Sequence, residues 1–315
     1  MNRLRIVFCG TPQFAVPSLK KLLSQPDFEI VGVFTQPDRP RGRGQEVSFS
    51  PVKEVALAAA IPVHQPEKVR APDVEEQLRT LAPDAIVIIA YGQIIPARLL
   101  QIPRLGWINL HASLLPKYRG AAPIHWAIAN GESGTGNTTM RIDAGMDTGE
   151  MLLQQELSIG SDETAPELAV RLAEAGAELM TETLRGLQSG KLTTRQQDHS
   201  VASYAPILKR EDGRIDWGRP AQEIYNRMRG FAPWPGAYTE FRGQTCHLWG
   251  KPVSKEGSSG APGTLMAQHG KLLVVCGAAT VMELAHVKLE GRKQISATEF
   301  ANGARLQPGE RFGQS

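Results

Sequence analysis

The sequence predicts an α/β fold, in which a mostly parallel sheet with flanking helices is followed by a small β-barrel. In the first part of the chain, short apolar runs alternate with segments of helical spacing, a pattern typical of βαβ units. Residues 189–205 are polar and lack an apolar stripe, as expected of a linker. Beyond them, strand-length segments separated by turn residues are typical of a small barrel. We therefore expect domains over residues 1–188 and 206–315.

Apolar runs define the strands of the first domain, and segments with one apolar face or an early proline define its helices. Strands are expected at residues 4–9, 30–34, 61–64, 84–90, 107–110, 137–142 and 150–157. Helices are expected at residues 14–23, 51–60, 71–81, 123–129 and 164–187. The run at residues 85–90 is the most apolar, so we place it at the centre of the sheet. This alternation predicts a Rossmann-like arrangement.

Residues 35–50 form a long loop in this interpretation, with Arg39, Arg41 and Arg43 among proline and glycine. Sixteen residues exceed a plain connection in a compact domain, and loops of this length are usually functional. The composition leaves two interpretations open, a solvated basic loop and a phosphate-binding arm.

The second domain is expected to contain one helix at residues 221–228 and several short strands. The strands are predicted at residues 238–241, 246–249, 263–266, 272–276 and 281–287. Residues 206–315 hold 15 Lys and Arg against 10 Asp and Glu, a net charge of +5, whereas residues 1–205 have a net charge of −2. A mildly basic second domain permits contact with a polyanion but does not require it.

The absence of several sequence motifs disfavours certain classes of protein. Its three cysteines are far apart without a CxxC motif, which disfavours a disulfide framework and a zinc site and fits a cytoplasmic setting. The longest clean apolar run, at residues 85–90, is far shorter than a membrane span. The chain has no GxGxxG after its first strand and no GxxxxGK[ST], HExxH or GxSxG motif. Dinucleotide and nucleoside triphosphate sites, zinc proteolysis and serine hydrolysis are therefore disfavoured.

Asn109, His111 and Asp147 are the candidate catalytic residues. Asn109 and His111 lie two residues apart at the end of an apolar strand, so both side chains leave the same face. Asp147 lies in a glycine-rich turn at residues 143–149, after another strand. In α/β enzymes the chemistry lies at the carboxyl ends of strands and in the loops beyond them. His125 is the nearest competitor, but its helical surroundings favour a packing role.

An Asn, His and Asp set without a nucleophile suits direct transfer of an acyl-like group to an amine. Negative charge would build on the oxygen of a tetrahedral intermediate, where an amide and a protonated imidazole both donate hydrogen bonds. A neighbouring carboxylate stabilises the protonated imidazole and can accept the amine proton. The alternative, left open by the residues alone, is three polar groups that cap strand ends.

Two long motifs resemble those of the formyltetrahydrofolate-dependent formyltransferases. Residues 109–123 read NLHASLLPKYRGAAP, and residues 143–149 read DAGMDTG. Within that family the chain is most similar to the members that act on methionyl-tRNA. This second resemblance covers nearly the whole chain, fades after about residue 297, and rests on residues 8–15, 34–44, 215–217 and 233–239.

The resemblance implies formyl transfer from 10-formyltetrahydrofolate, as co-substrate, to the α-amino group of methionine on initiator tRNA, without a metal. It implies catalytic roles for Asn109, His111 and Asp147. The implied folate-contacting positions are Ser113, Leu114, Leu115 and Pro116, with the main chain of residues 91–93 as a further candidate for the pteridine. Arg43 is implied to read the acceptor end of the tRNA. The second domain is similar to an oligonucleotide-binding (OB-like) fold facing the tRNA, and we expect a monomer.

Three rival functions remain to be tested. The nearest is formyl transfer to another amine, such as an amino-sugar nucleotide, against which the arginine-bearing loop and the second domain argue. Another is a non-catalytic RNA-binding protein on a degenerate enzyme scaffold, against which the intact Asn109, His111 and Asp147 set argues. A nucleotide-dependent dehydrogenase is disfavoured by the missing glycine fingerprint.

Overall fold

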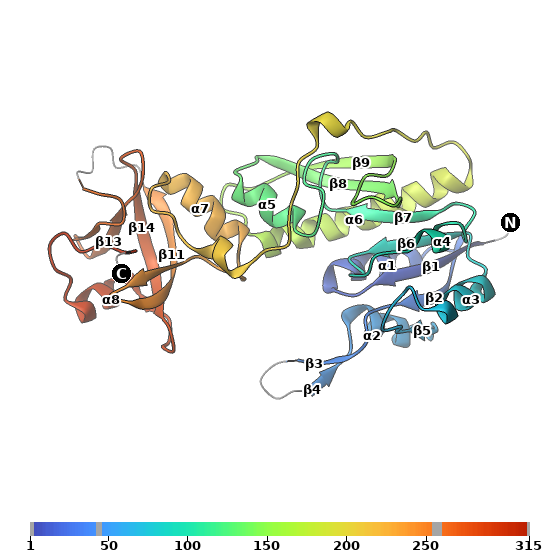
Figure 1. Ribbon diagram of the computed structural model, residues 1–315, viewed down its shortest axis with the longest axis horizontal. Coiled ribbons are helices and arrows are strands. Elements are labelled where there is room, and N and C mark those ends of the chain that lie inside the picture. The colour runs from blue at the N-terminus through green and yellow to red at the C-terminus, as the bar shows by residue number, and fades with distance from the viewer. Residues whose placement is uncertain (1–2, 42–45, 254–259, 314–315) are drawn as a thin grey trace. The chain divides into compact units, whose positions relative to one another are not determined.

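The computed structural model describes residues 3–41, 46–253 and 260–313, and its chain divides into two compact units (Figure 1). Unit 1 comprises Met1–Pro123, Gly134–Ser158 and Leu168–Pro206, and unit 2 comprises Ile124–Ser133, Ile159–Glu167 and Ile207–Ser315. Two short segments that precede residue 168 therefore pack with the C-terminal part. Residues 189–205, which we predicted to be a linker, belong to unit 1.

Unit 1 is built on a seven-stranded sheet in the order β5-β2-β1-β6-β7-β8-β9. The strands are β1 (Leu4–Gly10), β2 (Phe28–Phe34), β5 (Val63–His64), β6 (Ala85–Ile89), β7 (Trp107–His111), β8 (Gly134–Arg141) and β9 (Met151–Ser158). The pairs from β5 to β7 are parallel, whereas β8 and β9 run antiparallel. The helices are α1 (Val16–Leu23), α2 (Pro51–Ala58), α3 (Pro72–Leu81), α4 (Ala97–Leu100) and α6 (Ala165–Gln188), with a 3-10 turn at His199–Val201.

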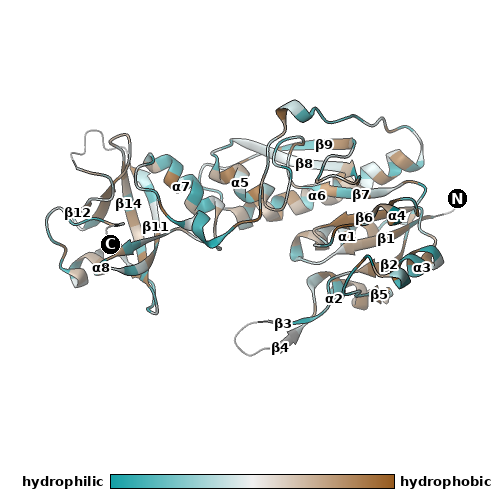
Figure 2. Cartoon of the chain, in the orientation of Figure 1, coloured by the Kyte–Doolittle hydropathy of each residue, from teal (hydrophilic) through white to brown (hydrophobic). Residues whose placement is uncertain are grey.

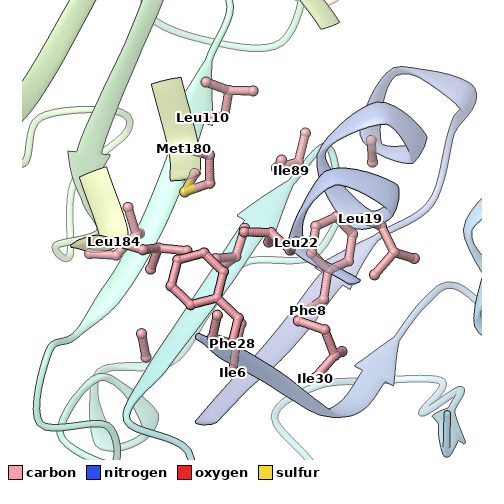
Figure 3. Packing of buried hydrophobic residues seen from close by; sticks show 14 of the residues in the cluster. Ile6, Phe8, Leu19, Leu22, Phe28, Ile30, Ile89, Leu110, Met180 and Leu184 are labelled. Carbon is pink, nitrogen blue, oxygen red and sulfur yellow. The ribbon is translucent and has the colours of Figure 1, made fainter. Parts of the chain in front are cut away.

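The central parallel strands of the unit 1 sheet are buried on both faces, which explains why they are continuous apolar runs. In β1, Ile6 and Phe8 belong to one core cluster, and Val7 and Cys9 to another, because successive side chains leave opposite faces. All five residues of β6 are buried, and Figure 2 shows brown along this strand. Helices α1 and α6 cover the face of Ile6 and Phe8 (Figure 3). Burial on both faces is what parallel sheets require.

A short hairpin replaces part of the loop predicted over residues 35–50. Strand β3 (Arg39–Arg41) pairs antiparallel with β4 (Glu46–Ser48), so the expectation of sixteen residues without secondary structure is wrong. Pairing along these strands satisfies backbone donors and acceptors that a free loop would leave to water. Arg43, predicted to contact tRNA, lies outside the described residues.

Unit 2 contains an antiparallel sheet in the order β10-β11-β14-β13-β12, with β15 paired to β14. Its strands are β10 (Tyr238–Phe241), β11 (Gln244–Val253), β12 (Leu265–Gln268), β13 (Lys271–Val275), β14 (Val281–Leu289) and β15 (Ile295–Ser296). Its helices are α5 (Pro123–Ala129), α7 (Ala221–Gly230) and α8 (Ala297–Ala304), with a 3-10 turn at Arg210–Gly213. The predicted fold class, a mostly parallel sheet with helices followed by a separate strand-rich antiparallel domain, is confirmed.

The core of unit 2 is rich in aromatic side chains. Phe300 of α8 packs edge-on against Phe241 at 5.0 Å between ring centroids, and Phe312 stacks with Trp217 at 5.6 Å. Helix α8 was not predicted, although its start carries a capping box: Ser296 Oγ accepts from the Glu299 amide, and the Glu299 carboxylate accepts from the Ser296 amide. None of the described helices is both long and apolar enough to cross a membrane.

Candidate active site

Strand β7 presents Asn109 and His111 on one face, as predicted, at the carboxyl end of the parallel part of the sheet. Asn109 is half-buried and His111 is buried. Among the described residues, the Asn109 side-chain amide has no hydrogen-bond partner. The amide is therefore available to donate to a bound molecule.

The imidazole of His111 is fixed by the loop that follows its own strand. Its Nε2 lies 2.9 Å from the main-chain oxygen of Tyr118, and its Nδ1 lies 3.7 Å from Oδ2 of Asp147. Because a carbonyl oxygen can only accept, Nε2 carries the proton of this hydrogen bond. The other ring nitrogen, Nδ1, consequently faces the Asp147 carboxylate and is the one available to the reaction.

Asp147 is held in a tight turn, with φ of 52°. Its Oδ2 accepts a hydrogen bond of 2.8 Å from the main-chain amide of Gly120. The turn is closed by Thr148 Oγ1, which donates to Asp143 at 2.8 Å, and a Cβ on Gly145 would lie 2.0 Å from that hydroxyl. A glycine is thus required at position 145 for the turn that carries Asp147. The structure brings all three predicted catalytic residues together.

The four predicted folate-contacting residues form the loop directly after β7. Ser113 and Leu115 are buried, whereas Leu114 and Pro116 are half-buried. The Ser113 hydroxyl donates to the main-chain oxygen of Lys117 at 2.6 Å, so its role in this structure is to close the loop. Side-chain contact with a ligand would therefore come mainly from Leu114 and Pro116.

Thr138 of β8 anchors this loop and was not singled out from the sequence. It is fully buried, its hydroxyl donates to the Ser113 carbonyl at 2.7 Å, and the same oxygen accepts from the Leu115 amide at 3.1 Å. Gln154 of β9 donates to the Leu115 carbonyl at 2.9 Å. The loop is therefore fixed to the antiparallel strands beside it before any ligand binds.

The main chain after β6, the further candidate for the pteridine, is partly occupied by protein contacts. The Tyr91 carbonyl accepts from Gln36 Nε2 at 3.0 Å and from Thr11 Oγ1 at 3.3 Å. Gly92 has φ of 84°, a conformation that favours glycine. The Tyr91 hydroxyl is buried without a hydrogen-bond partner among the described residues. The Tyr91 carbonyl is thus used by protein contacts, whereas the main-chain groups of Gly92 and Gln93 have no hydrogen-bond partner among the described residues.

Two further side chains close to the site come from residues 189–205, which carry no periodic signal in the sequence. Gln197 donates to the main-chain oxygen of Asp147 at 2.8 Å, and Ser203 Oγ accepts from the Tyr118 amide at 2.9 Å. His125 belongs to unit 2, where burial lowers its pKa. In the described part of the chain, no group of three or more His, Cys, Asp or Glu is arranged to hold a metal ion.

Family models and similar proteins of known name all point to one protein family. Residues 4–184 match the model described as "Formyl transferase", and residues 207–305 match "Formyl transferase, C-terminal domain". Methionyl-tRNA formyltransferase of Solibacter usitatus is 52% identical over 311 residues, covering 99% of each chain. The enzyme of the same name from Geobacter metallireducens is 52% identical over 315 residues, covering 99% of this chain and all of its own.

Solved structures with a similar fold are more distant in sequence. A sugar 3N-formyl transferase, solved in the presence of dTDP and 5-N-formyl-THF, is 18% identical with a TM-score of 0.66, covering 93% of this chain and 100% of its own. An N-formyltransferase from Helicobacter canadensis, in complex with folinic acid and dTDP-3-aminofucose, is 18% identical with a TM-score of 0.65, covering 90% and 99%. These likenesses concern the fold. Two family models match most of the chain, and relatives about 50% identical match it over nearly their full length. The chain therefore belongs to the formyl transferase family, among the methionyl-tRNA formyltransferases.

Proposed function

We propose that the protein transfers the formyl group of 10-formyltetrahydrofolate to the α-amino group of methionine on initiator tRNA. The main support for this reaction is the geometry at the end of β7. The Asn109 amide has no hydrogen-bond partner among the described residues, and the Nδ1 atom of His111 faces Asp147. Among the described residues, no serine or cysteine side chain bonds to the His111 imidazole, so in this proposal the acceptor amine itself attacks. We expect this reaction to take place in the cytoplasm, with the protein as a monomer.

In the proposed mechanism, the neutral amine of methionine attacks the formyl carbon and forms a carbon–nitrogen bond. The carbonyl electrons move to oxygen, where the Asn109 amide and protonated His111 donate hydrogen bonds to the developing charge. Asp147 stabilises the protonated imidazole and accepts the proton that the attacking amine loses, directly or through water. The bond to the folate nitrogen then breaks, and this nitrogen leaves with a proton from the same groups.

The folate co-substrate is proposed to lie against residues 113–116. This loop follows β7 directly. A formyl group on a folate bound there would therefore lie near Asn109 and His111, at the end of the same strand. The half-buried side chains of Leu114 and Pro116 offer apolar contact, and the anchoring by Thr138 keeps them in place. An apolar surface with a few fixed polar groups is typical of small-ligand sites.

Initiator tRNA is proposed to contact the hairpin of β3 and β4, with Arg43 at its acceptor end, and the basic second part of the chain. Residues 206–315 have a net charge of +5, which suits a polyanion. The base of the hairpin is anchored by Lys53 of α2, which pairs with Asp38 and donates to Gln65 Oε1 at 2.8 Å.

The experiment is a formylation assay with labelled 10-formyltetrahydrofolate and several acceptors in parallel. The acceptors are methionyl initiator tRNA, methionyl elongator tRNA and a dTDP-linked amino sugar, the last because the fold is shared with sugar formyltransferases. Formylation of the initiator alone is expected. Arg43→Ala should lower kcat/KM for the initiator, whereas Arg70→Ala, at an exposed position, should not. Preferential formylation of the amino sugar would contradict the proposal.

A further inference from the structure

Residues 195–205 run alongside the loop that contacts His111 and the turn that carries Asp147, and we call this segment the strap. At its start, Arg195 exchanges two main-chain hydrogen bonds of 2.9 Å with Met151, just after the Asp147 turn. At its end, the Arg119 amide donates to the Ser203 carbonyl at 2.8 Å, and the Ala205 amide donates to the Arg119 carbonyl at 2.7 Å. The strap therefore pairs with the loop after β7 and with the start of β9.

Gln197 lies near the start of the strap, and both the nitrogen and the oxygen of its side-chain amide form hydrogen bonds. It is 5% exposed. Its Nε2 donates at 2.8 Å to the carbonyl of Asp147 and at 2.8 Å to that of Gly149. Its Oε1 accepts from Arg119 Nε at 3.0 Å and from Arg119 Nη2 at 2.6 Å. One side chain thus joins the peptide of the catalytic aspartate to the loop whose Tyr118 carbonyl holds His111.

Ser203 makes the second connection, on the histidine side. Its hydroxyl accepts from the Tyr118 amide at 2.9 Å, at a residue whose φ of 61° is unusual for a tyrosine. The carbonyl of the same Tyr118 accepts from His111 Nε2. Ser203 consequently fixes both peptides of Tyr118: its hydroxyl holds the one before Tyr118, and its carbonyl, which accepts from the Arg119 amide, holds the one whose oxygen orients the imidazole.

The buried guanidinium of Arg119 depends on the contacts between the strap and the loop after β7. Its side chain is 2% exposed, and among the described residues its guanidinium has no carboxylate partner. Its partners are the neutral acceptors Gln197 Oε1 and His199 Nδ1, the latter at 3.0 Å from Nη2. A buried charge needs such acceptors because it has lost its water. Any shift of the strap would leave this charge without partners, which holds the strap in one position.

We propose that Gln197 and Ser203 of the strap are positioning residues that set the geometry of the His111 and Asp147 pair. Neither side chain needs to touch either substrate, because each acts on a peptide next to a catalytic group. The inference rests on the proposed function, since it assigns the pair to catalysis. Small displacements of catalytic groups are costly: about 1 Å of misplacement can lower a rate by roughly 100-fold.

The decisive variant is Gln197→Glu. A glutamate keeps the acceptor for Arg119 and adds an ion pair, so the protein should remain folded. It cannot donate to the carbonyls of Asp147 and Gly149, so the Asp147 turn loses its two hydrogen bonds. We expect kcat to fall ~10- to 100-fold, with KM for folate and for tRNA changed by no more than about twofold. The neighbouring Gln196→Ala is the matched control, because the described hydrogen bond of the exposed Gln196 side chain is to Glu150.

A second pair of variants tests the histidine side. Ser203→Ala removes the acceptor of the Tyr118 amide and should also lower kcat more than it changes either KM. Ser200→Ala is its control, since in the described part of the chain the Ser200 hydroxyl bonds to Asp198 alone. If folded Gln197→Glu and Ser203→Ala both kept native kcat, or if the controls lost as much, the inference would be wrong.

His111→Ala in the same assay separates this inference from the proposed function. An inactive His111→Ala beside fully active strap variants would overturn the positioning role alone. A fully active His111→Ala would instead overturn the proposed mechanism. Folded state is checked for every variant by its thermal unfolding midpoint, so a loss of kcat at unchanged midpoint reports geometry and not unfolding.

Discussion

The side chains of His111 and Asp147 are held by one loop, residues 118–120. The carbonyl of Tyr118 accepts from His111 Nε2 at 2.9 Å, and the amide of Gly120 donates to Asp147 Oδ2 at 2.8 Å. The two proposed catalytic groups lie 3.7 Å apart between Nδ1 and Oδ2, beyond a direct hydrogen bond. The pair can therefore tighten when substrates bind, as catalytic hydrogen bonds often do.

Asn109→Ala should remove one of the two donors to the developing oxyanion. Loss of such a donor costs about 2.7–4 kcal/mol of transition-state stabilisation, or ~100- to 1,000-fold in kcat. Steady-state formylation kinetics with the methionyl initiator tRNA measures this. Asn302→Ala, at an exposed position of α8, is the control. A folded Asn109→Ala enzyme with native kcat would exclude Asn109 from catalysis.

Thr138→Val should loosen the loop of residues 113–116. The valine has nearly the same shape but can neither accept from the Leu115 amide nor donate to the Ser113 carbonyl. Leaving buried polar groups unpaired costs about 1–3 kcal/mol, which denaturant unfolding measures. KM for 10-formyltetrahydrofolate should rise as well. Thr135→Val is the matched control, since Thr135 is buried in the same strand and its hydroxyl has no described hydrogen bond.

Lys53→Met should release the base of the β3 and β4 hairpin. Lys53 is 13% exposed and its partner Asp38 is 19% exposed, so the pair is largely shielded from water. Losing about 1.4 kcal/mol of this anchoring would weaken tRNA binding roughly tenfold. We expect a higher KM for tRNA with an unchanged KM for folate. Equal changes in both constants, or a similar effect of Lys20→Met at an exposed site of α1, would contradict a local role.

Asp84 should make the stability of the protein depend on pH in the acid range. Burial raises the pKa of this carboxyl, but hydrogen bonds from the Arg5 amide at 2.9 Å and from Arg104 Nε at 2.7 Å outweigh it, so the pKa is lowered. The pKa of an unfolded aspartate is about 3.9. The stabilisation is therefore complete above about pH 4 and is lost as the pH falls through the lower pKa of the folded state.

Asp84→Asn should accordingly be less stable than the native protein at pH 7, and the difference should shrink below about pH 4. Urea unfolding midpoints from pH 7 to pH 3 measure it. Glu76→Gln, at an exposed position of α3, should show no such convergence. A difference that stays constant over this range would mean that Asp84 does not contribute through its charge.

The central strands and β7, which bears the candidate catalytic residues, could be predicted from the sequence because each is a short, buried, largely apolar run. Burial on both faces of the sheet leaves no ambiguity about β1 or β6, and alternation then places Asn109 and His111 on one face. Asp147 was identified through its glycine-rich turn and the family resemblance. These features are local in sequence, so periodicity and turn chemistry reveal them.

The hairpin and the strap could not be predicted because their structure depends on distant partners. Nothing near Gln197 indicates that its amide bonds to Arg119, 78 residues away, and to Asp147, 50 residues away. A polar segment without a period is the expected signature of a linker, and only tertiary contacts turn it into part of the site. Helix α8, by contrast, did carry a local signal in Ser296 and Glu299.

The central claim is that Asn109, His111 and Asp147 transfer formyl from folate to the methionyl amine. The most direct measurement is single-turnover transfer of labelled formyl from 10-formyltetrahydrofolate to methionyl initiator tRNA, by the native protein and by His111→Ala, with both substrates saturating. The account predicts rapid transfer by the native protein and a loss of ~100-fold or more in the variant. Native rates in a folded His111→Ala protein, or no transfer by the native protein, would contradict it.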